Sequence, residues 1–276
     1  MDASLFIAKT GLTAQQTRMQ VISNNLANVN TTGFKKDRAV FEDLLYQNVV
    51  PAGGQADAQT QTPTGLMLGT GTRVVATEKL HGQGNIISTE NALDIAIAGE
   101  GFLSVQQADG TVAYTRDGSM KLDAQGQLVT AGGEAIIPAI QIPQNAISVT
   151  IGRDGTVTAE LANGGGAAQV GQINLSIFVN NSGLRPIGRN LMLPTEASGA
   201  AIVAIPGEAG SGMLMQGSLE ASNVNVVEEM VNMIETQRAY EINSKAISAA
   251  DGMLRFLNNC LLYTSDAADE RPSVDL

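Results

Sequence analysis

Apolar residues near the start of the chain recur at the alternating three- and four-residue spacing of a helical stripe. One polar member, Gln15, interrupts a series that consists of Leu5, Ala8, Leu12, Met19, Ile22, Leu26 and Val29. Such a heptad stripe predicts a long helix over roughly the first thirty residues, with one face packed against a partner. Asp2 or Ser4 is the expected N-cap. A helix that lies on the core of its own domain is the alternative interpretation.

A second helical pattern covers residues 223–259. Its apolar stripes comprise Val224, Val227, Val231, Ile234, Ala239, Ile242, Ala246, Ala249, Met253 and Phe256. Two long stripes at opposite ends of one chain are expected to pair with each other as a coiled-coil-like core. That pairing leaves the apolar positions Val226, Met230, Met233 and Ile247 uncovered, so we expect further copies of the chain to cover them.

Between these ends the apolar period changes to two residues, which is typical of β-strands. Strands are predicted at residues 72–77, 93–98, 102–106, 112–115, 120–123, 148–151, 156–161, 173–179 and 201–205. The pairs Asp109-Gly110, Asp117-Gly118 and Asp154-Gly155 are hairpin signals, because Asp and Gly tolerate the positive φ angles of tight turns. The predicted fold class is α+β, with long terminal helices and a central all-β domain.

The chain is predicted to have five parts. Residues 1–46 form the N-terminal helix and its end, and they join residues 216–259 in a helical core domain. Residues 72–215 form the β-rich domain. Residues 47–71 are rich in Gln, Thr, Gly and Pro and nearly free of charge, so they are either an extended arm or a flexible loop. The fifth part is a tail at 260–276.

The tail begins with the single cysteine, Cys260, where the pattern changes abruptly. One back-translation of residues 260–270 resembles a transposon-end adapter used in DNA library preparation, so we interpret residues 260–276 as adapter read-through. An ordinary polar tail is the alternative, and resequencing the native gene distinguishes the two. The tail holds four acidic residues and one arginine, so a chain without it would carry −8 rather than −11.

Composition argues against several functional classes. A net charge of −11 does not suit nucleic acid or anionic lipid, and no apolar run is long enough to suggest membrane insertion. The N-terminus lacks a basic region followed by an apolar block, so we expect no cleavable signal peptide. With one His and one Cys, a His/Cys metal site is not expected, and neither is a cofactor.

No catalytic residue stands out either. The lone histidine, His81, lies in a Gly-rich stretch, and such a residue is more often a turn residue than a catalyst. Carboxylates at Asp94, Asp109, Asp117, Asp123 and Asp154 leave a glycosidase-like acid pair open. Turn formation explains three of these five more simply, because each precedes a glycine. We therefore expect a protein that is not an enzyme.

Residues 23–34 form the most specific motif in the chain. Its characteristic members are Asn24, Asn25, Leu26, Asn28, Thr31, Gly33 and Phe34. We expect a helix end at which asparagine and threonine side chains bond free backbone groups, Gly33 turns the chain and Phe34 anchors it. This segment resembles the N-terminal signature of flagellar rod and hook axial proteins. Four further segments show the same resemblance, at residues 38–46, 114–119, 151–155 and 222–241, and together they extend it over residues 1–259.

The resemblance implies a structural subunit of the bacterial flagellar distal rod, in the periplasm and up to the level of the outer membrane. It implies a homo-oligomeric helical tube with the terminal helices inside and the β-domain outside. The implied partners are proximal rod subunits, the hook protein, the surrounding basal-body ring proteins and the flagellar type III export apparatus. It also implies that residues 47–65 stiffen the rod. Coupled folding and assembly of the terminal helices is the expected mechanism.

Three alternatives remain open. A proximal rod subunit of the same family has similar ends, and the long 47–65 segment argues against it. A periplasmic carbohydrate-processing enzyme would show turnover on peptidoglycan. A cytoplasmic coiled-coil adaptor is disfavoured by the large β-rich middle.

Overall fold

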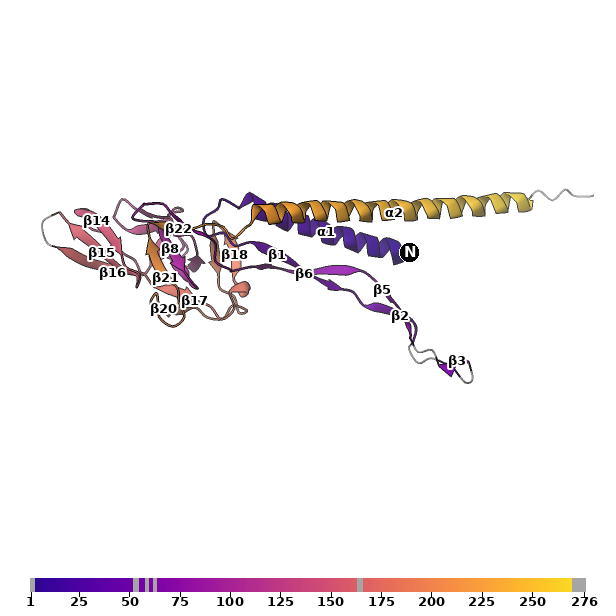
Figure 1. Ribbon diagram of the computed structural model, residues 1–276, viewed down its shortest axis with the longest axis horizontal. Coiled ribbons are helices and arrows are strands. Elements are labelled where there is room, and N and C mark those ends of the chain that lie inside the picture. Colours follow the sequence, from indigo (N-terminus) through magenta and orange to yellow (C-terminus); the bar gives the residue numbers. More distant parts are fainter. Residues whose placement is uncertain (1–2, 52–54, 58–59, 62–63, 163–165, 270–276) are drawn as a thin grey trace, which may run out of the picture. The chain divides into compact units, whose positions relative to one another are not determined.

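The computed structural model describes residues 3–51, 55–57, 60–61, 64–162 and 166–269. The chain divides into two compact units, each built from discontinuous segments. The first contains residues 1–23, 38–77 and 230–276, and the second contains residues 24–37 and 78–229. Two long helices and many strands confirm the α+β class (Figure 1).

The first unit combines most of both terminal helices with a β-ribbon (Figure 1). Helix α1 spans Ala3–Ala27 and helix α2 spans Val226–Asp269, and the two lie side by side. Strand β1 (Asp37–Asp43) pairs with β6 (Thr72–Lys79). The other pairs are β2 (Tyr46–Val50) with β5 (Leu66–Gly69), and β3 (Gln55–Asp57) with β4 (Thr60–Gln61).

The second unit is built around a nine-stranded sheet, as far as the chain is described. Its main path runs β11 (Met120–Leu122), β12 (Leu128–Thr130), β13 (Ala135–Ile137), β9 (Phe102–Gln106), β10 (Val112–Thr115), β19 (Leu191–Leu193) and β18 (Arg185–Gly188). Strand β17 (Leu175–Ile177) also pairs with β9 and carries β20 (Ile202–Ala204) on its other edge. The central strands bury Leu103, Val105 and Leu175 completely, which places the core of this unit against β9.

Shorter elements complete the second unit. They are the three-stranded sheet β14 (Ala146–Ile151), β15 (Thr156–Leu161) and β16 (Ala167–Gln172), the pair β8 (Ile95–Ala98) and β21 (Met213–Gln216), the pair β7 (Ile86–Ser88) and β22 (Ser218–Glu220), and the 3₁₀ turn η1 (Asn181–Gly183). Each strand predicted from the two-residue period has a counterpart, from β6 to β20.

Two predicted boundaries are wrong. Strand β1 lies inside the range 1–46 that we assigned to a helix and its end, and β22 lies inside the range 216–259 assigned to the C-terminal helix. Both strands are formed by pairing with distant segments, which local periodicity does not reveal. The pair Asp117-Gly118 forms a side-chain turn onto Ser119, but it does not close a hairpin, because β10 and β11 are not partners.

The segment predicted as an arm or a flexible loop contains the regular ribbon β2–β5. The part of this segment that includes Pro63 lies outside the described residues, as does the loop at 163–165.

Helix α2 differs from its prediction at both ends. It begins at Val226 rather than at residue 223, and it continues to Asp269 through ten residues of the predicted tail. Leu, Ala and Asp residues there are compatible with a helix, so the change of pattern at Cys260 causes no break. At the other end of the chain, Ser4 is inside α1 rather than a cap, and Asp2 lies outside the described residues.

Candidate assembly surfaces and a buried junction

The apolar stripe of α1 is partly covered within the chain. Ile22 is buried, and the other stripe members are intermediate in exposure, namely Leu5, Ala8, Leu12, Met19, Leu26 and Val29. Contacts to α2 lie along this helix: Gly11 faces Asn243, and Arg18 Nη2 lies 3.4 Å from Asn232 Oδ1 and 3.9 Å from Glu235. A Cβ on Gly11 would come within 3.2 Å of the Asn243 amide, so the glycine permits a close approach of the two helices.

The apolar stripe of α2, by contrast, faces solvent. Val227 is 70% exposed, Ile234 58%, Ile242 66% and Met253 64%, and Val231 and Ala246 are exposed as well. The prediction that the two stripes pair with each other is therefore wrong for α2. Its shielded face is mixed instead, with Asn232, Thr236 and Asn243 beside the partly buried Met233, Ala239 and Ile247.

The ribbon β2–β5 is also exposed on both of its faces. Neither strand contains a charged residue, yet Tyr46 is 58% exposed, Met67 56% and Val49 53%, and Leu45 just before the ribbon is 89% exposed. A two-stranded ribbon without cover is marginally stable in water. These residues form a second uncovered apolar surface.

The motif at residues 23–34 builds a hydrogen-bonded junction in the second unit. Buried Asn25 accepts from Asp37 N at 2.8 Å and donates to Asp37 O at 2.9 Å, so one side chain replaces a strand partner. It also lies 3.4 Å from Glu229, at the start of α2. Asn28 donates to Asn24 O at 2.9 Å, and Thr31 donates to Asn28 at 3.2 Å. The expected side-chain bonding at the helix end is confirmed.

Gly33 provides the turn that follows. Its φ is +67°, and a Cβ there would lie 2.7 Å from the Arg116 carbonyl carbon, so only glycine fits without a shift. Its N–H donates to Glu220 O at 2.8 Å. Phe34 is partly buried, and Lys79 Nζ lies 4.9 Å from its ring centroid.

An ion cluster that the sequence analysis missed lies next to this turn. Lys35 Nζ is 2.6 Å from Glu220 Oε1, and Arg116 Nε is 3.4 Å from Glu220 Oε2. The side chains of Lys35 and Glu220 are fully buried, and that of Arg116 is 4% exposed. Burial lowers the pKa of Lys35 and of Arg116 by disfavouring their charged forms, while Glu220 opposes the effect. The sequence shows only that residues 35, 116 and 220 are charged, and it does not reveal that they meet in a buried cluster.

His81 is part of the same region and is not the simple turn residue that we predicted. Its ring packs edge-on against Phe102, with 5.6 Å between centroids. Neither ring nitrogen has a hydrogen-bond partner among the described residues, and both are shielded from solvent. Burial, together with the charges of Lys35, Arg116 and Lys79, lowers the pKa of His81 to about 4.

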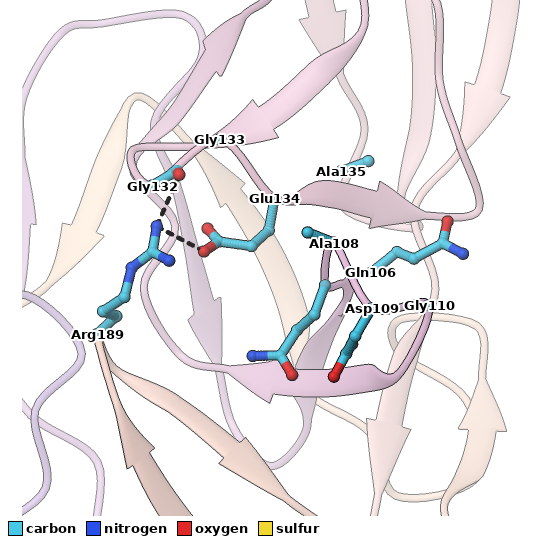
Figure 2. Close-up of a pocket in the computed structure, with 10 residues that line it drawn as sticks. Gln106, Ala108, Asp109, Gly110, Gly132, Gly133, Glu134, Ala135 and Arg189 are labelled. Atoms are coloured by element: carbon cyan, nitrogen blue, oxygen red, sulfur yellow. Dashed lines mark hydrogen bonds and ion pairs between the residues drawn. The ribbon is translucent and has the colours of Figure 1, made fainter.

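One hollow of the second unit has a volume of about 700 Å³ (Figure 2). Arg189 reaches across it and binds Glu134 at 2.7 Å and Gly132 O at 2.7 Å. Asp109 also lines it, but its carboxylate accepts hydrogen bonds from Thr111, which lower its pKa. A glycosidase acid needs a raised pKa. The lowered pKa of Asp109 therefore does not suit the proton-donating role in a glycosidase-like pair.

Among the described residues, no cluster of His, Cys, Asp or Glu could hold a metal ion. No described helix has the length and apolar character needed to span a membrane.

Comparison with known families identifies the class of protein. Residues 5–35 match the model "Flagella basal body rod protein", and residues 215–260 match "Flagellar basal body rod FlgEFG protein C-terminal". Residues 96–159 match "Flagellar hook protein FlgE/F/G D1 domain". These matches cover the motif and α1, the start of α2, and the centre of the β-sheet. They define the class as flagellar axial proteins, which are structural and not enzymes.

Individual relatives narrow this class. Flagellar basal-body rod protein FlgG of Buchnera aphidicola subsp. Schizaphis graminum is 56% identical over 258 residues, covering 94% of this chain and 99% of that protein. FlgG of Borreliella burgdorferi is 48% identical over 261 residues, covering 94% and 98%. FlgG of Bacillus subtilis is 40% identical over 265 residues, covering 94% and 99%. The chain belongs to the flagellar basal-body rod protein family, which places it in the basal body.

Proposed function

We propose that copies of this chain assemble into the rigid helical tube of the flagellar distal rod, which transmits torque to the hook. The observation that carries the proposal is the uncovered apolar stripe on α2. A single chain leaves Val227, Ile234 and Ile242 more than half exposed along one helix. Isolated surface hydrophobics are common, but a stripe of this length indicates a protein-binding surface.

The proposed partner for this stripe is another copy. Burial of apolar area stabilises association by about 25 cal/mol per Å², so a stripe of large side chains supplies a substantial driving force. One copy offers the stripe, and its neighbour covers it with a different surface, so the contact is heterologous. A heterologous contact whose rotation does not close generates a helical array.

The ribbon β2–β5 supports the stiffness of such a tube. We propose that residues 47–65 and the strands around them dock on neighbouring copies, where Tyr46, Val49 and Met67 become covered. A docked arm adds a second contact per copy, and two contacts restrict sliding more than one. Proximal rod subunits, the hook protein, ring proteins and the export apparatus are the remaining proposed partners, and family membership supports them.

The stripe is tested by placing a charge at its centre. We expect Ile234→Asp to abolish filaments in electron micrographs of the concentrated chain, because a buried unpaired carboxylate is costly. Gln237→Asp adds the same charge at an exposed polar position of α2 and should leave filaments intact. The circular dichroism of both variants should match the parent, since neither position is buried in the single chain. Normal filaments from Ile234→Asp would refute the proposal.

The apolar stripe of α1 is tested in the same way, by the introduction of a charge. Leu12→Asp on the α1 stripe is expected to block filaments while the β-domain stays folded. A proximal rod subunit is the alternative assignment, and the long segment at residues 47–65 favours the distal one.

A further inference from the structure

His81 occupies a position in which its backbone neighbours hold both chain ends to the β-domain. Leu80 N donates to Lys36 O at 2.9 Å. Gly82 O accepts from Lys35 Nζ at 2.8 Å and from Asn223 Nδ2 at 3.0 Å. Gly84 N donates to Glu220 Oε1 at 2.9 Å. Lys35 follows α1 and Asn223 precedes α2, so the loop at residues 80–84 joins both connections.

In the part of the chain that the structure describes, the ring of His81 makes no hydrogen bond of regular geometry, and the backbone of Asn181 is the polar group that acts on it. Both nitrogens are buried and unbonded among the described residues, and Phe102 covers one edge. The guanidinium of Arg116 lies 5.7 Å from the centroid of the same Phe102 ring. A neutral imidazole tolerates this apolar seat better than an imidazolium, which needs two acceptors.

The charges around the ring are mostly positive. Lys35 from the motif segment, Lys79 from the end of β6 and Arg116 after β10 each act on His81. The carboxylates nearby are engaged: Glu220 binds Lys35 and Arg116, Asp37 binds Lys79 at 2.9 Å, and Glu100 acts on Arg116. The backbone of Asn181 is the one neighbour that favours the charged ring. A proton on His81 thus adds a further positive charge at a place where Glu220 and Asp37 are already paired with cations.

We propose that neutral His81 keeps the loop at residues 80–84 in place and that acid disrupts this arrangement. Protonation of His81 then releases the loop together with the connections to both terminal helices. To gain water, the imidazolium must leave its seat against Phe102. Movement of the loop then breaks the bonds of Gly82 O and Gly84 N to Lys35, Asn223 and Glu220. The proposal concerns the β-domain of a single chain and does not depend on assembly.

The sign of the pH effect follows from linkage. The pKa of His81 is about 4 in the folded chain against the ordinary 6.5. Between these values the unfolded chain binds the proton and the folded chain does not, so stability falls as pH falls through this window and levels off below it. At about pH 4.5 the histidine alone shifts the folding equilibrium toward the unfolded state by about 60-fold relative to pH 7.

The single histidine makes the first measurement unambiguous. In the full chain, kept below the concentration at which it assembles, the imidazole signal is followed by NMR as a function of pH. We expect a midpoint near 4, or unfolding before the ring titrates. A midpoint at or above 6 in the folded chain overturns the proposal, and this result does not require any variant to fold.

The second measurement separates the histidine from the carboxylates. Urea unfolding of the parent and of His81→Gln is compared at about pH 7 and about pH 4.5. Between these two pH values the folding equilibrium constant of the parent should fall about 60-fold more than that of the variant. Hydrogen exchange at Gly33, Leu80 and Gly84 should accelerate in acid in the parent only, after correction for the intrinsic rate. Parallel pH profiles, or an acceleration spread evenly into β15, overturn the proposal.

Discussion

At the residue scale, Glu220 is the carboxylate that both buried cations of the ion cluster share. Lys35 lies 2.6 Å from one of its oxygens and Arg116 lies 3.4 Å from the other. Gly84 N–H also donates to Glu220, at 2.9 Å. Because a charge without a partner is costly in a buried site, the cluster depends on this residue more than on either cation.

Glu220→Gln is therefore expected to destabilise the chain by about 3–5 kcal/mol, since two buried cations lose their counter-charge. Urea unfolding at neutral pH measures the change. Glu228→Gln is the matched control, because Glu228 pairs with Lys36 at 3.4 Å on the surface and should cost less than about 1 kcal/mol. If both variants lose the same small amount of unfolding free energy, the buried cluster contributes little to stability.

Gly33 and Gly110 allow a second residue-scale test. Both have positive φ, +67° and +84°, but a Cβ on Gly33 meets backbone at 2.7 Å, whereas a Cβ on Gly110 meets nothing within 4 Å. We expect Gly110→Ala to cost about 1 kcal/mol from backbone strain alone. Gly33→Ala should cost more than about 2 kcal/mol, because crowding adds to strain. Thermal unfolding compares the two variants. Similar melting temperatures would show that crowding at Gly33 adds nothing to the backbone strain.

The motif illustrates what single residues reveal in a sequence. Asn28 was predicted to bond a free backbone group at a helix end and Gly33 to turn the chain, and both do so, whereas the bonds of Asn25 were not predicted. The partners that complete the junction were not predicted. Glu220 and Arg116 are separated from Lys35 by many residues, and a single charged residue carries no periodic signal that would show where it is buried.

At the element scale, prediction succeeded where a strand has a local signal. Strand β15 alternates in burial and follows the Asp154-Gly155 turn, and both features are visible in the sequence. Strands β7 and β22 have three residues each and exist because they pair with each other across the chain. A stretch of three residues contains too little pattern to distinguish from a loop.

The two helices show a different limit of sequence reasoning. An apolar stripe predicts that a surface is buried, but not what covers it. The α1 stripe is partly covered within the chain, whereas α2 turns Asn232 and Asn243 toward α1 and leaves its apolar stripe outside. Short polar side chains opposite Gly11 allow close packing of the helices. The exposed stripe remains for a partner, which is the basis of the proposed assembly.

The ribbon gives the element-scale prediction. Leu68 in β5 is 48% exposed, so Leu68→Asp should change the free energy of unfolding by no more than about 0.5 kcal/mol. The same change should raise the concentration needed for filaments, because the ribbon is proposed to dock on a neighbouring copy. Ala124→Asp, at an exposed turn of the second unit, is the control of equal charge. Unchanged filament formation in Leu68→Asp would remove the ribbon from the proposed contacts.

At the scale of the whole molecule, net charge opposes the proposed assembly. Each copy carries −11, so neighbouring copies repel at low ionic strength. The screening length falls from about 14 Å at 0.05 M salt to about 4 Å at 0.5 M. Apolar contacts are not weakened by this change. We therefore expect the filament-forming concentration to fall as salt rises over this range, as measured by sedimentation, and a rise would indicate that ion pairs between copies dominate.

The C-terminal tail allows the charge argument to be tested without touching either apolar surface. A chain that ends at Asn259 carries −8 instead of −11 and keeps all of the proposed stripe residues. We expect it to form filaments at a lower concentration than the full chain in low salt, and the difference should shrink when screening removes the repulsion. This outcome also fits a tail that is foreign to the assembly. If the shortened chain fails to form filaments at any salt concentration, residues 260–276 belong to the interface, and the adapter interpretation of the tail is wrong.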